Sequence, residues 1–419
     1  MSRATTILLS LIAGIAAGAI LAAFAPGAVD GALAVAQPLG AAWLNGLQMT
    51  VVPLVVALII TGVAATAEAA SAGRIAVRAI GLFVVSVFVT GTIAALVTPL
   101  LLDVVPIPRA AADALRGALV GATEVTPPPP LSEFFSTIVP SNVIAAASGS
   151  AFLSLIIFTL AFAFAVTRLE REPRARIVGL FQAIQDAMLV LVDWVLWLAP
   201  IGVFALAFVV AGRTGTAAIG ALLHYIGIVS AIGLVILLLA YPLALIGGRV
   251  SLPRFARALA PAQAVGVSTQ SSLASLPAML KGAETLGIAP TTAGLVLPLA
   301  VAMFRATQPA MNIAISIYIA RWFGIAIEPG NLIAATMVAA LVSLGSVSLP
   351  AQISFFASVA PPATALGVPI APLGLLIAVE TIPDIFRTIG NISMDMAALT
   401  VVARGKKSLD SPLSTVRAE

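Results

Sequence analysis

The sequence predicts an all-α protein that crosses a membrane many times, and two observations carry this prediction. Of the 419 residues, 61% are hydrophobic and only 9% are charged, whereas soluble proteins carry about 25% charged residues. Apolar runs of about 20 residues, the length that crosses a bilayer as a helix, follow one another without a hydrophilic block large enough to fold separately. These observations exclude a water-soluble fold and predict one membrane domain.

The residue types exclude several functions. The chain has no cysteine and a single histidine, which rules out thiolate chemistry and metal sites built from several histidines. It also lacks the His-Glu-x-x-His and Gly-x-Ser-x-Gly motifs of hydrolases. The small excess of 21 Lys and Arg over 17 Asp and Glu is spread over short loops. We therefore expect no enzyme, no nucleic-acid partner and no cofactor beyond a coupling sodium ion or proton.

Six apolar runs are long enough to span the bilayer. The fifth is much longer than a bilayer requires, so we expect a tilted or bent helix there. The first run follows Arg3 and could also be read as a secretory signal, but we favour a retained first helix. The six runs cover residues 6–26, 39–66, 79–102, 137–167, 177–211 and 217–247.

Basic residues cluster in alternate loops. Cytoplasmic loops accumulate Lys and Arg, so we expect these segments and both termini inside the cell, in a cytoplasmic (inner) membrane. The longest opposite loop holds the stiff run Pro127–Pro130, which suits an outer-face linker. The clustered residues are Arg3, Arg74, Arg78, Arg168, Arg171, Arg174, Arg176, Arg249, Arg254, Arg257, Arg404, Lys406 and Lys407.

Beyond residue 257 the apolar stretches become short and interrupted. The chain turns at the polar run 269–272 and again over 343–350, and between these turns a helix from about residue 291 is interrupted over 304–309. Irregular backbone at membrane depth persists only where it is buried or lines a cavity, and such segments point to the binding site of a transporter. We therefore predict two re-entrant helical hairpins around a broken helix, with ordinary loops or proline kinks as the alternative.

The last predicted helix, 377–401, carries most of the charges at membrane depth. At 100° per residue its main polar groups fall within an arc of about 80° that cannot face lipid. The guanidinium of Arg387 can grip a carboxylate with two parallel hydrogen bonds, and Asp384, one turn away, can hold an ammonium group. An internal ion pair of Arg387 with Asp384 or Asp395 is the alternative. The stripe consists of Glu380, Asp384, Arg387, Asn391 and Asp395.

The order of these elements resembles the glutamate transporter homologues, the dicarboxylate/amino acid:cation symporter family, over essentially the whole chain. The most specific pieces are Ser271-Ser272 followed by Leu276-Pro277, and Asp384-x-x-Arg387-Thr388-x-x-Asn391-x-x-x-Asp395. The resemblance implies a homotrimer with an elevator fold of about eight transmembrane helices and two re-entrant hairpins. Residues 1–257 would be mainly scaffold, with the third and sixth helices packing on a transport domain at 258–404, and 405–419 would be a cytoplasmic tail.

The resemblance also implies roles for particular residues. The solute would be aspartate, glutamate or a C4-dicarboxylate; Asp384 favours the amino acids, because it would repel a dicarboxylate that has no amine. Substrate binding is expected from Ser271, Ser272, Gln308, Asp384, Arg387, Thr388 and Asn391. A gate is expected from Ser346, Ser348 and Pro350, and cation binding from Ser343, Ser346, Asn391 and Asp395.

The broken helix departs from the family pattern. The family signature Asn-Met-Asp-Gly-Thr aligns with residues 304–308, so Phe304 and Ala306 replace an amide and an acid that bind sodium. On the third helix, Ser86 is followed by Val87 where the family has hydroxyls, and hard cations need such oxygens. We hypothesise that Arg305, brought near Asp395, substitutes for one bound sodium ion. Coupling would then use less sodium, protons or no cation; a realigned site built from Thr307 and Gln308 is the alternative.

Three other functions stay open at this stage. A permease subunit driven by a separate ATPase would agree with the absence of a P-loop. A channel or sensor derived from the same fold would agree with the missing cation ligands. A membrane hydrolase using Ser271 as its nucleophile would lack any base visible in the sequence.

Overall fold

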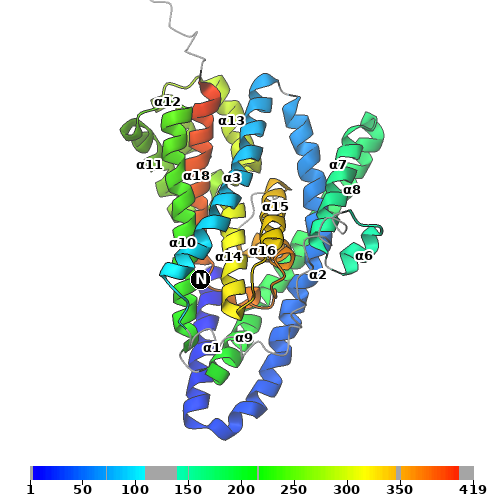
Figure 1. Ribbon diagram of the computed structural model, residues 1–419, viewed down its shortest axis with the longest axis vertical. Helices are drawn as coiled ribbons and strands as arrows, with labels where there is room; N and C mark the ends of the chain where they lie inside the picture. Colours follow the sequence, from blue (N-terminus) through cyan, green and yellow to red (C-terminus); the bar gives the residue numbers. More distant parts are fainter. Residues whose placement is uncertain are drawn as a thin grey trace, which may run out of the picture.

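The computed structural model describes residues 3–71, 73–108, 139–149, 151–214, 217–345 and 351–404, and every regular element in these ranges is helical. The all-α prediction is confirmed for this part of the chain (Figure 1). The elements in chain order are α1 (Arg3–Phe24), η1 (Pro26–Ala28), α2 (Val29–Ala70), α3 (Arg74–Val104), α6 (Val143–Ser148), α7 (Phe152–Thr167), α8 (Arg171–Trp197), α9 (Ala199–Thr214), α10 (Ala217–Pro242), η2 (Leu243–Gly247), α11 (Leu252–Thr269), α12 (Ser272–Thr285), α13 (Pro290–Met303), α14 (Thr307–Phe323), α15 (Pro329–Gly345), α16 (Ala351–Ala365), α17 (Leu373–Leu376) and α18 (Thr381–Ala403).

Membrane-spanning length occurs in six segments of the described chain. They are Thr5–Phe24, Pro26–Ala70, Arg74–Val104, Arg171–Trp197, Ile219–Gly247 and Thr381–Ala403, each long and apolar enough to cross a bilayer. The described helices thus support a multi-pass membrane protein.

Two of the predicted spans are divided. The predicted single helix over 137–167 is wrong in its described part, where α6 and α7 are separate helices. Asn142 starts α6 by accepting hydrogen bonds from the backbone N–H groups of Ile144 and Ala145 at 2.9 and 3.1 Å, and Gly149 follows its end. The long run 177–211 bends as expected, because α8 ends at Trp197 and α9 begins at Ala199.

The first helix packs closely along α9. Gly14 and Gly18 face α9, and a Cβ atom at either position would lie 2.5 Å from the backbone oxygen of Phe204 or Phe208. Glycines four residues apart let two membrane helices approach backbone to backbone. Figure 1 shows α1 and α9 together at one end of the molecule, with α2 extending along its side.

Two antiparallel helix pairs flank the broken helix. The pair α11 and α12 turns at Gln270, whose φ of 52° is in the left-handed region. Two side chains fix α11 to α18, since the Nε2 of Gln263 donates to Ser393 Oγ at 3.0 Å and the Nε2 of Gln270 donates to the backbone oxygen of Thr381 at 3.1 Å. The second pair, α15 and α16, also packs side by side. Their placement as re-entrant hairpins in a bilayer stays a prediction.

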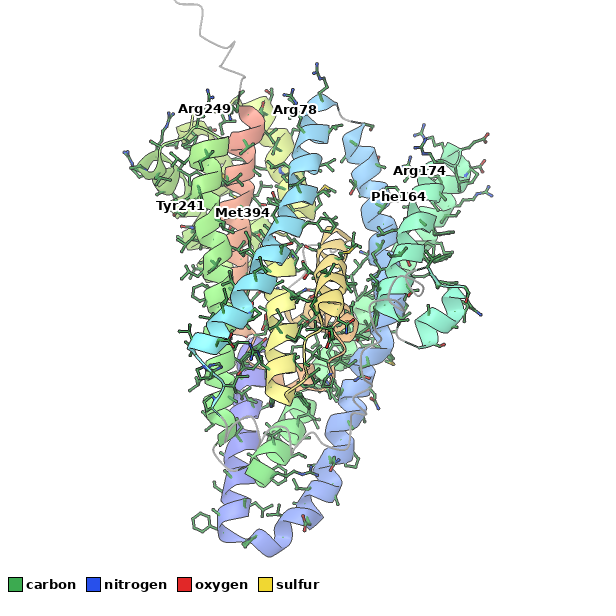
Figure 2. The ribbon with its side chains drawn as sticks, in the orientation of Figure 1. Arg78, Phe164, Arg174, Tyr241, Arg249 and Met394 are labelled. Atoms are coloured by element: carbon green, nitrogen blue, oxygen red, sulfur yellow. The ribbon has the colours of Figure 1, made fainter. Side chains whose placement is uncertain are left out.

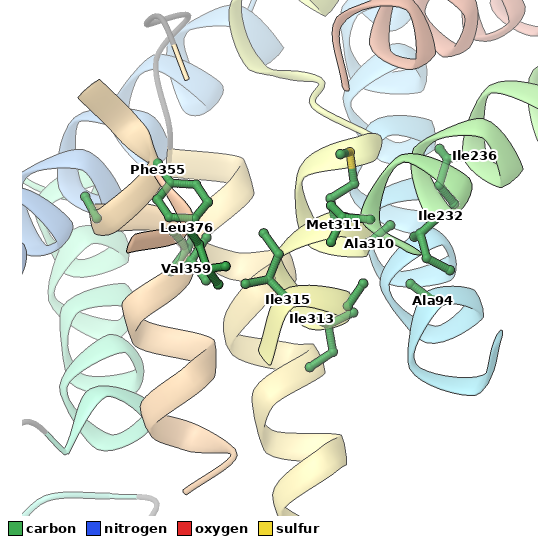
Figure 3. Packing of buried hydrophobic residues seen from close by; sticks show 14 of the residues in the cluster. Ala94, Ile232, Ile236, Ala310, Met311, Ile313, Ile315, Phe355, Val359 and Leu376 are labelled. Carbon is green, nitrogen blue, oxygen red and sulfur yellow. The ribbon is translucent and has the colours of Figure 1, made fainter. Parts of the chain in front are cut away.

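The predicted interruption of the helix after residue 291 is present and shorter than expected. Helix α13 ends at Met303 and α14 begins at Thr307, so only residues 304–306 leave the helix. Pro309 lies in the first turn of α14, where its missing N–H costs no helical hydrogen bond. Every residue of 307–320 is buried, and Figure 3 shows α14 between Ile232 and Ile236 of α10 on one side and Phe355 and Val359 of α16 on the other.

Basic residues from distant parts of the sequence meet at one end of the molecule. Figure 2 shows Arg78, Arg174 and Arg249 at the same end, on or beside α3, α8 and η2. This is the distribution that the positive-inside pattern requires. The identity of that side as cytoplasmic stays a prediction.

The contact between α18 and the start of α14 depends on the absence of a side chain at Gly390. A Cβ atom there would lie 2.4 Å from Thr307 Cγ2, and this methyl group cannot turn away because the Thr307 hydroxyl bonds to α18. We predict that Gly390→Ala destabilises the protein by about 1–3 kcal/mol, as overpacking does, seen as a lower thermal unfolding midpoint in detergent. Adding Thr307→Ser, which removes only the methyl group, should restore most of the loss.

The matched control is Gly179→Ala on α8, where an added Cβ meets nothing within 4 Å. That variant should unfold at the wild-type temperature or above it, because alanine favours a helix over glycine. An unchanged midpoint in Gly390→Ala would contradict the close approach of α18 to α14.

Candidate functional site

The polar stripe of the last helix is buried inside the protein, as predicted. Its members are enclosed by α10, α11, α13 and α14, and the Arg387 side chain is 11% exposed. Such groups would be costly to expose to hydrocarbon. The buried polar residues at the start of this helix and along it are Glu380, Asp384, Thr388, Asn391, Ser393, Asp395 and Thr400.

Arg387 is paired inside the protein. Its Nη2 donates to Glu380 Oε1 at 2.5 Å and its Nη1 donates to Asn312 Oδ1 at 3.1 Å. Its Nε has no hydrogen-bond partner and lies 3.5 Å from Asp384 Oδ1. The internal ion pair left open by the sequence therefore exists with Asp384 as the looser partner, and the main partner is Glu380.

Glu380 connects the arginine to α10. Its Oε2 accepts a hydrogen bond from the Tyr225 hydroxyl at 2.8 Å, and both residues are fully buried. Asn312 connects the arginine to α16 in the same way, because its Nδ2 donates to the backbone oxygen of Ser358 at 3.0 Å. One guanidinium thus joins α18 to three other parts of the fold.

Sequence reasoning missed Glu380 and Asn312 as partners of Arg387, and Tyr225 as the partner of Glu380. Glu380 precedes Arg387 by seven residues, close to two helical turns, and this spacing could have identified the pair. Asn312 and Tyr225 lie on other helices, and no local pattern relates them to Arg387.

Asn391 and Thr307 hold the broken helix against α18. The Oδ1 of Asn391 accepts from the Thr307 backbone N–H at 3.0 Å and from its hydroxyl at 2.7 Å. The same hydroxyl lies 2.9 Å from the backbone oxygen of Arg387. The first N–H groups of a helix have no partner within it, and Asn391 supplies one. Its expected roles toward substrate and cation stay predictions.

Asp395 is fully buried, and neither of its carboxylate oxygens accepts a hydrogen bond from the part of the chain that the structure describes. The opposite charge that acts on it belongs to Arg305, in the interruption between α13 and α14, and Arg305 also attracts Asp384. Ser343, expected as a cation ligand, donates to the backbone oxygen of Arg305 at 3.1 Å and so supports the non-helical segment.

The space between α3 and the interruption is apolar. The rings of Phe83 and Phe304 stack with their centroids 4.5 Å apart and their planes 8° from parallel. Val87 and Ala306 are fully buried beside this region, and Ser86 is also buried. Stacked rings offer no oxygen to a hard cation, so Phe83 and Phe304 cannot themselves be sodium ligands.

The remaining predicted site residues are distributed around the start of α18. The Oγ of Ser271 caps α12 by accepting from the Ala274 N–H at 3.2 Å, and Ser272 follows it as the first residue of α12. Gln270 ties this tip to Thr381. Gln308 and Thr388 are buried on α14 and α18. The predicted gate residues Ser346, Ser348 and Pro350 lie outside the described residues.

An all-helical membrane chain with a broken helix and a buried charged cluster has the architecture of a solute transporter. A family model described as the sodium:dicarboxylate symporter family matches residues 4–405, so the chain belongs to this family. It is a transport protein and not an enzyme.

Curated relatives cover nearly the whole chain. A C4-dicarboxylate transport protein of Rhizobium johnstonii is 26% identical over 97% of this chain and 90% of its own. A proton/sodium-glutamate symport protein of Bacillus subtilis is 25% identical over 88% of this chain and 85% of its own. A proton/glutamate-aspartate symporter of Escherichia coli is 24% identical over 89% of this chain and 86% of its own.

The hydroxyl of Thr307 can be tested by an isosteric change. Thr307→Val removes the hydroxyl that donates to Asn391 Oδ1 and lies against the Arg387 oxygen. Asn391 Oδ1 keeps the backbone N–H of Thr307 as a donor, so the loss is that of a buried hydrogen bond, about 1 kcal/mol, and we expect a lower thermal unfolding midpoint. Thr307→Ser keeps the hydroxyl and should unfold close to wild type; equal losses in both variants would contradict this account.

Proposed function

We propose that this protein is a secondary active transporter of acidic amino acids across the cytoplasmic membrane. The observation that carries the proposal is the guanidinium of Arg387, buried beside the carboxylate of Asp384 at 3.5 Å. A carboxylate of the solute would bind to Arg387 through paired hydrogen bonds, and its ammonium group would bind to Asp384. The names of the glutamate and aspartate symporters among the relatives support this assignment.

C4-dicarboxylates are the second candidate substrates. Several relatives are named for them, and they offer the same carboxylate to Arg387. The charge of the cluster favours the amino acids, because three carboxyl groups, on Glu380, Asp384 and Asp395, face two guanidiniums, on Arg305 and Arg387. Fully ionised, this cluster carries one negative charge, which would repel a dianion and is partly offset by a ligand's ammonium group.

The transport cycle would follow the elevator arrangement of the family. In our proposal residues 258–404 move relative to a trimeric scaffold, and α3 and α10 pack against this part through α14 and α18. Symport is favoured over a permease subunit of an ATP-driven system because the named relatives are symporters. A channel or sensor would give ion currents or signalling without solute accumulation.

Coupling is proposed to require less sodium than the family pattern implies. The guanidinium of Arg305 provides a fixed positive charge to Asp395, whose oxygens have no other partner among the described residues. The stacked Phe83 and Phe304 occupy the place where the family supplies oxygens on α3 and the broken helix. Arg305 would therefore take the place of one bound sodium ion, and protons or the remaining sodium would drive uptake.

The proposal is tested by uptake of radiolabelled aspartate into proteoliposomes, with succinate as competitor, under imposed sodium, proton or no cation gradients. Accumulation of aspartate under a proton gradient without sodium would support both the substrate and the coupling. Accumulation of succinate with no effect of aspartate would reassign the substrate to C4-dicarboxylates. Uptake with a full dependence on several sodium ions would overturn the role of Arg305.

Arg387→Lys should abolish efficient uptake although it keeps the positive charge. A lysine cannot make the two-bond contact with a carboxylate, and the loss of one charge-assisted hydrogen bond lowers uptake efficiency about 10- to 100-fold. The measurement is the initial rate of aspartate uptake as a function of concentration. Arg78→Lys at the exposed start of α3 is the control and should transport normally; normal uptake by Arg387→Lys would exclude it as the carboxylate site.

Arg305→Met should make uptake depend on sodium. The methionine has similar bulk and no charge, so Asp395 is left buried without a cation and aspartate uptake without sodium should fall by at least about 10-fold, the effect of an unpaired buried charge. Added sodium chloride should restore part of the rate, whereas added choline chloride should not.

The control for Arg305→Met is Arg321→Met, which makes the same change at a pair with Asp103 that is about half exposed. Exposed pairs contribute little, so this variant should resemble wild type in both salts. Wild-type rates for Arg305→Met in either salt would remove the basis for a built-in cation.

A further inference from the structure

Glu380 binds the guanidinium of Arg387 in the way that a ligand carboxylate would. Its Oε1 receives the Nη2 of Arg387 at 2.5 Å, and its Oε2 receives the Tyr225 hydroxyl at 2.8 Å. The side chain is 0% exposed. The carboxylate of Glu380 is therefore bound to the Arg387 guanidinium, the same group that we propose binds the substrate carboxylate.

A substrate carboxylate that binds Arg387 would share the nitrogen Nη2 with Glu380. Both two-bond geometries of a guanidinium use Nη2, either with Nη1 or with Nε. On Arg387, Nη1 already donates to Asn312, and Nε is free of hydrogen bonds. Nη2 carries two N–H groups, so a ligand that binds Arg387 through either edge shares this nitrogen with Glu380 and places its carboxylate beside that of Glu380. Two carboxylates that share one site cannot both stay ionised at low energetic cost.

Among the described residues, Arg387 is the cation that acts on Glu380. From α10, Tyr225 donates a hydrogen bond to Glu380. The Tyr225 ring contacts Tyr318 of α14, and the Tyr318 hydroxyl lies 3.2 Å from Nδ1 of His224. From α18, Glu380 faces Arg387 and Asp384, and Arg305 acts on Asp384 and Arg387. Tyrosines are neutral at physiological pH, and Asp384 adds a further negative charge.

We propose that Glu380 is the proton-binding residue of this transporter: it holds Arg387 while the site is empty and takes up one proton when the substrate carboxylate reaches Arg387. This inference rests on the proposed function. A buried carboxylate that loses its cation is strongly destabilised, and protonation removes its charge.

The proton balance is simple. The Nη2–H···Oε1 bond to Glu380 breaks, the ligand carboxylate takes the place of Glu380 on Nη2, and Oε1 of Glu380 takes up one proton from the buffered solution. The Tyr225 hydroxyl keeps its bond to Oε2. Substrate release reverses these steps, so one proton would travel with each substrate molecule. Because the charge of the proton offsets the single net negative charge of aspartate, the loaded site would carry the same net charge as the ionised empty site.

The test is calorimetric titration of the purified full-length protein with aspartate, without sodium, in two buffers that differ in ionisation enthalpy. The difference between buffers gives the number of protons taken up per bound aspartate. We expect about one proton for wild type and none for Glu380→Gln, which mimics the protonated side chain. Because Glu380→Gln no longer competes for Arg387 as an anion, it should also bind aspartate about 10-fold more tightly, the effect of one charge-assisted hydrogen bond.

Two further variants make the test specific. Glu284→Gln makes the same change at an exposed pair with Lys281 and should keep the wild-type proton uptake. Glu380→Asp keeps a carboxyl group but shortens its reach, so it should compete less well for Arg387 and bind aspartate more tightly. This variant tests the inference even where Glu380→Gln does not yield folded protein.

The outcomes separate the inference from the proposed function. Proton uptake that persists in Glu380→Gln, or aspartate affinity that is unchanged or weaker in Glu380→Asp, would overturn the role of Glu380. Aspartate binding to wild type without proton uptake would overturn it too and leave the proposed function intact. Wild-type protein that binds neither aspartate nor succinate, with or without sodium, would overturn the proposed function and this inference with it.

Discussion

The structure depends on the pairing of the guanidinium that α18 carries into the interior of the protein. A guanidinium buried without a partner would cost several kcal/mol, and the position of Arg387 therefore dictates those of Glu380, Asn312 and Tyr225. These partners come from the start of α18, from α14 and from α10, so one charge fixes the relative placement of three helices. The interruption between α13 and α14 acts farther along α18, because it places Arg305 where its positive charge acts on Asp395.

Much of the fold could be predicted because its determinants are local. Apolar runs predicted the long helices. Polar residues within short apolar segments predicted the interruption after Met303 and the turn at Gln270. The division of the span over 137–167 was missed because an apolar count ignores capping, and Asn142 starts a helix within that run. Similarly, a proline count extended the break to Pro309, although proline is acceptable in the first turn of α14.

The candidate site was predictable along one helix and unpredictable between helices. Periodicity placed the polar side chains of α18 on one buried face, and this was confirmed. It could not show that Asn391 would accept from Thr307, 84 residues earlier in the chain, or that a carboxylate at the helix start would reach Arg387 before any ligand did. Such partners depend on tertiary packing, for which a single sequence has no periodic signal.

The burial of residues 307–320, which form most of α14, has a consequence for how the protein is made. These residues are enclosed by the rest of the chain and include Asn312 and Gln308, so the segment would be poorly solvated alone in hydrocarbon. Its stable insertion requires a cavity already shaped by α3 and α10, and it is completed only when α18, synthesised later, supplies Asn391. We therefore expect this polar cluster to assemble in a cooperative late step, because a chain truncated before α18 would leave the polar groups of α14 in the membrane without their partners.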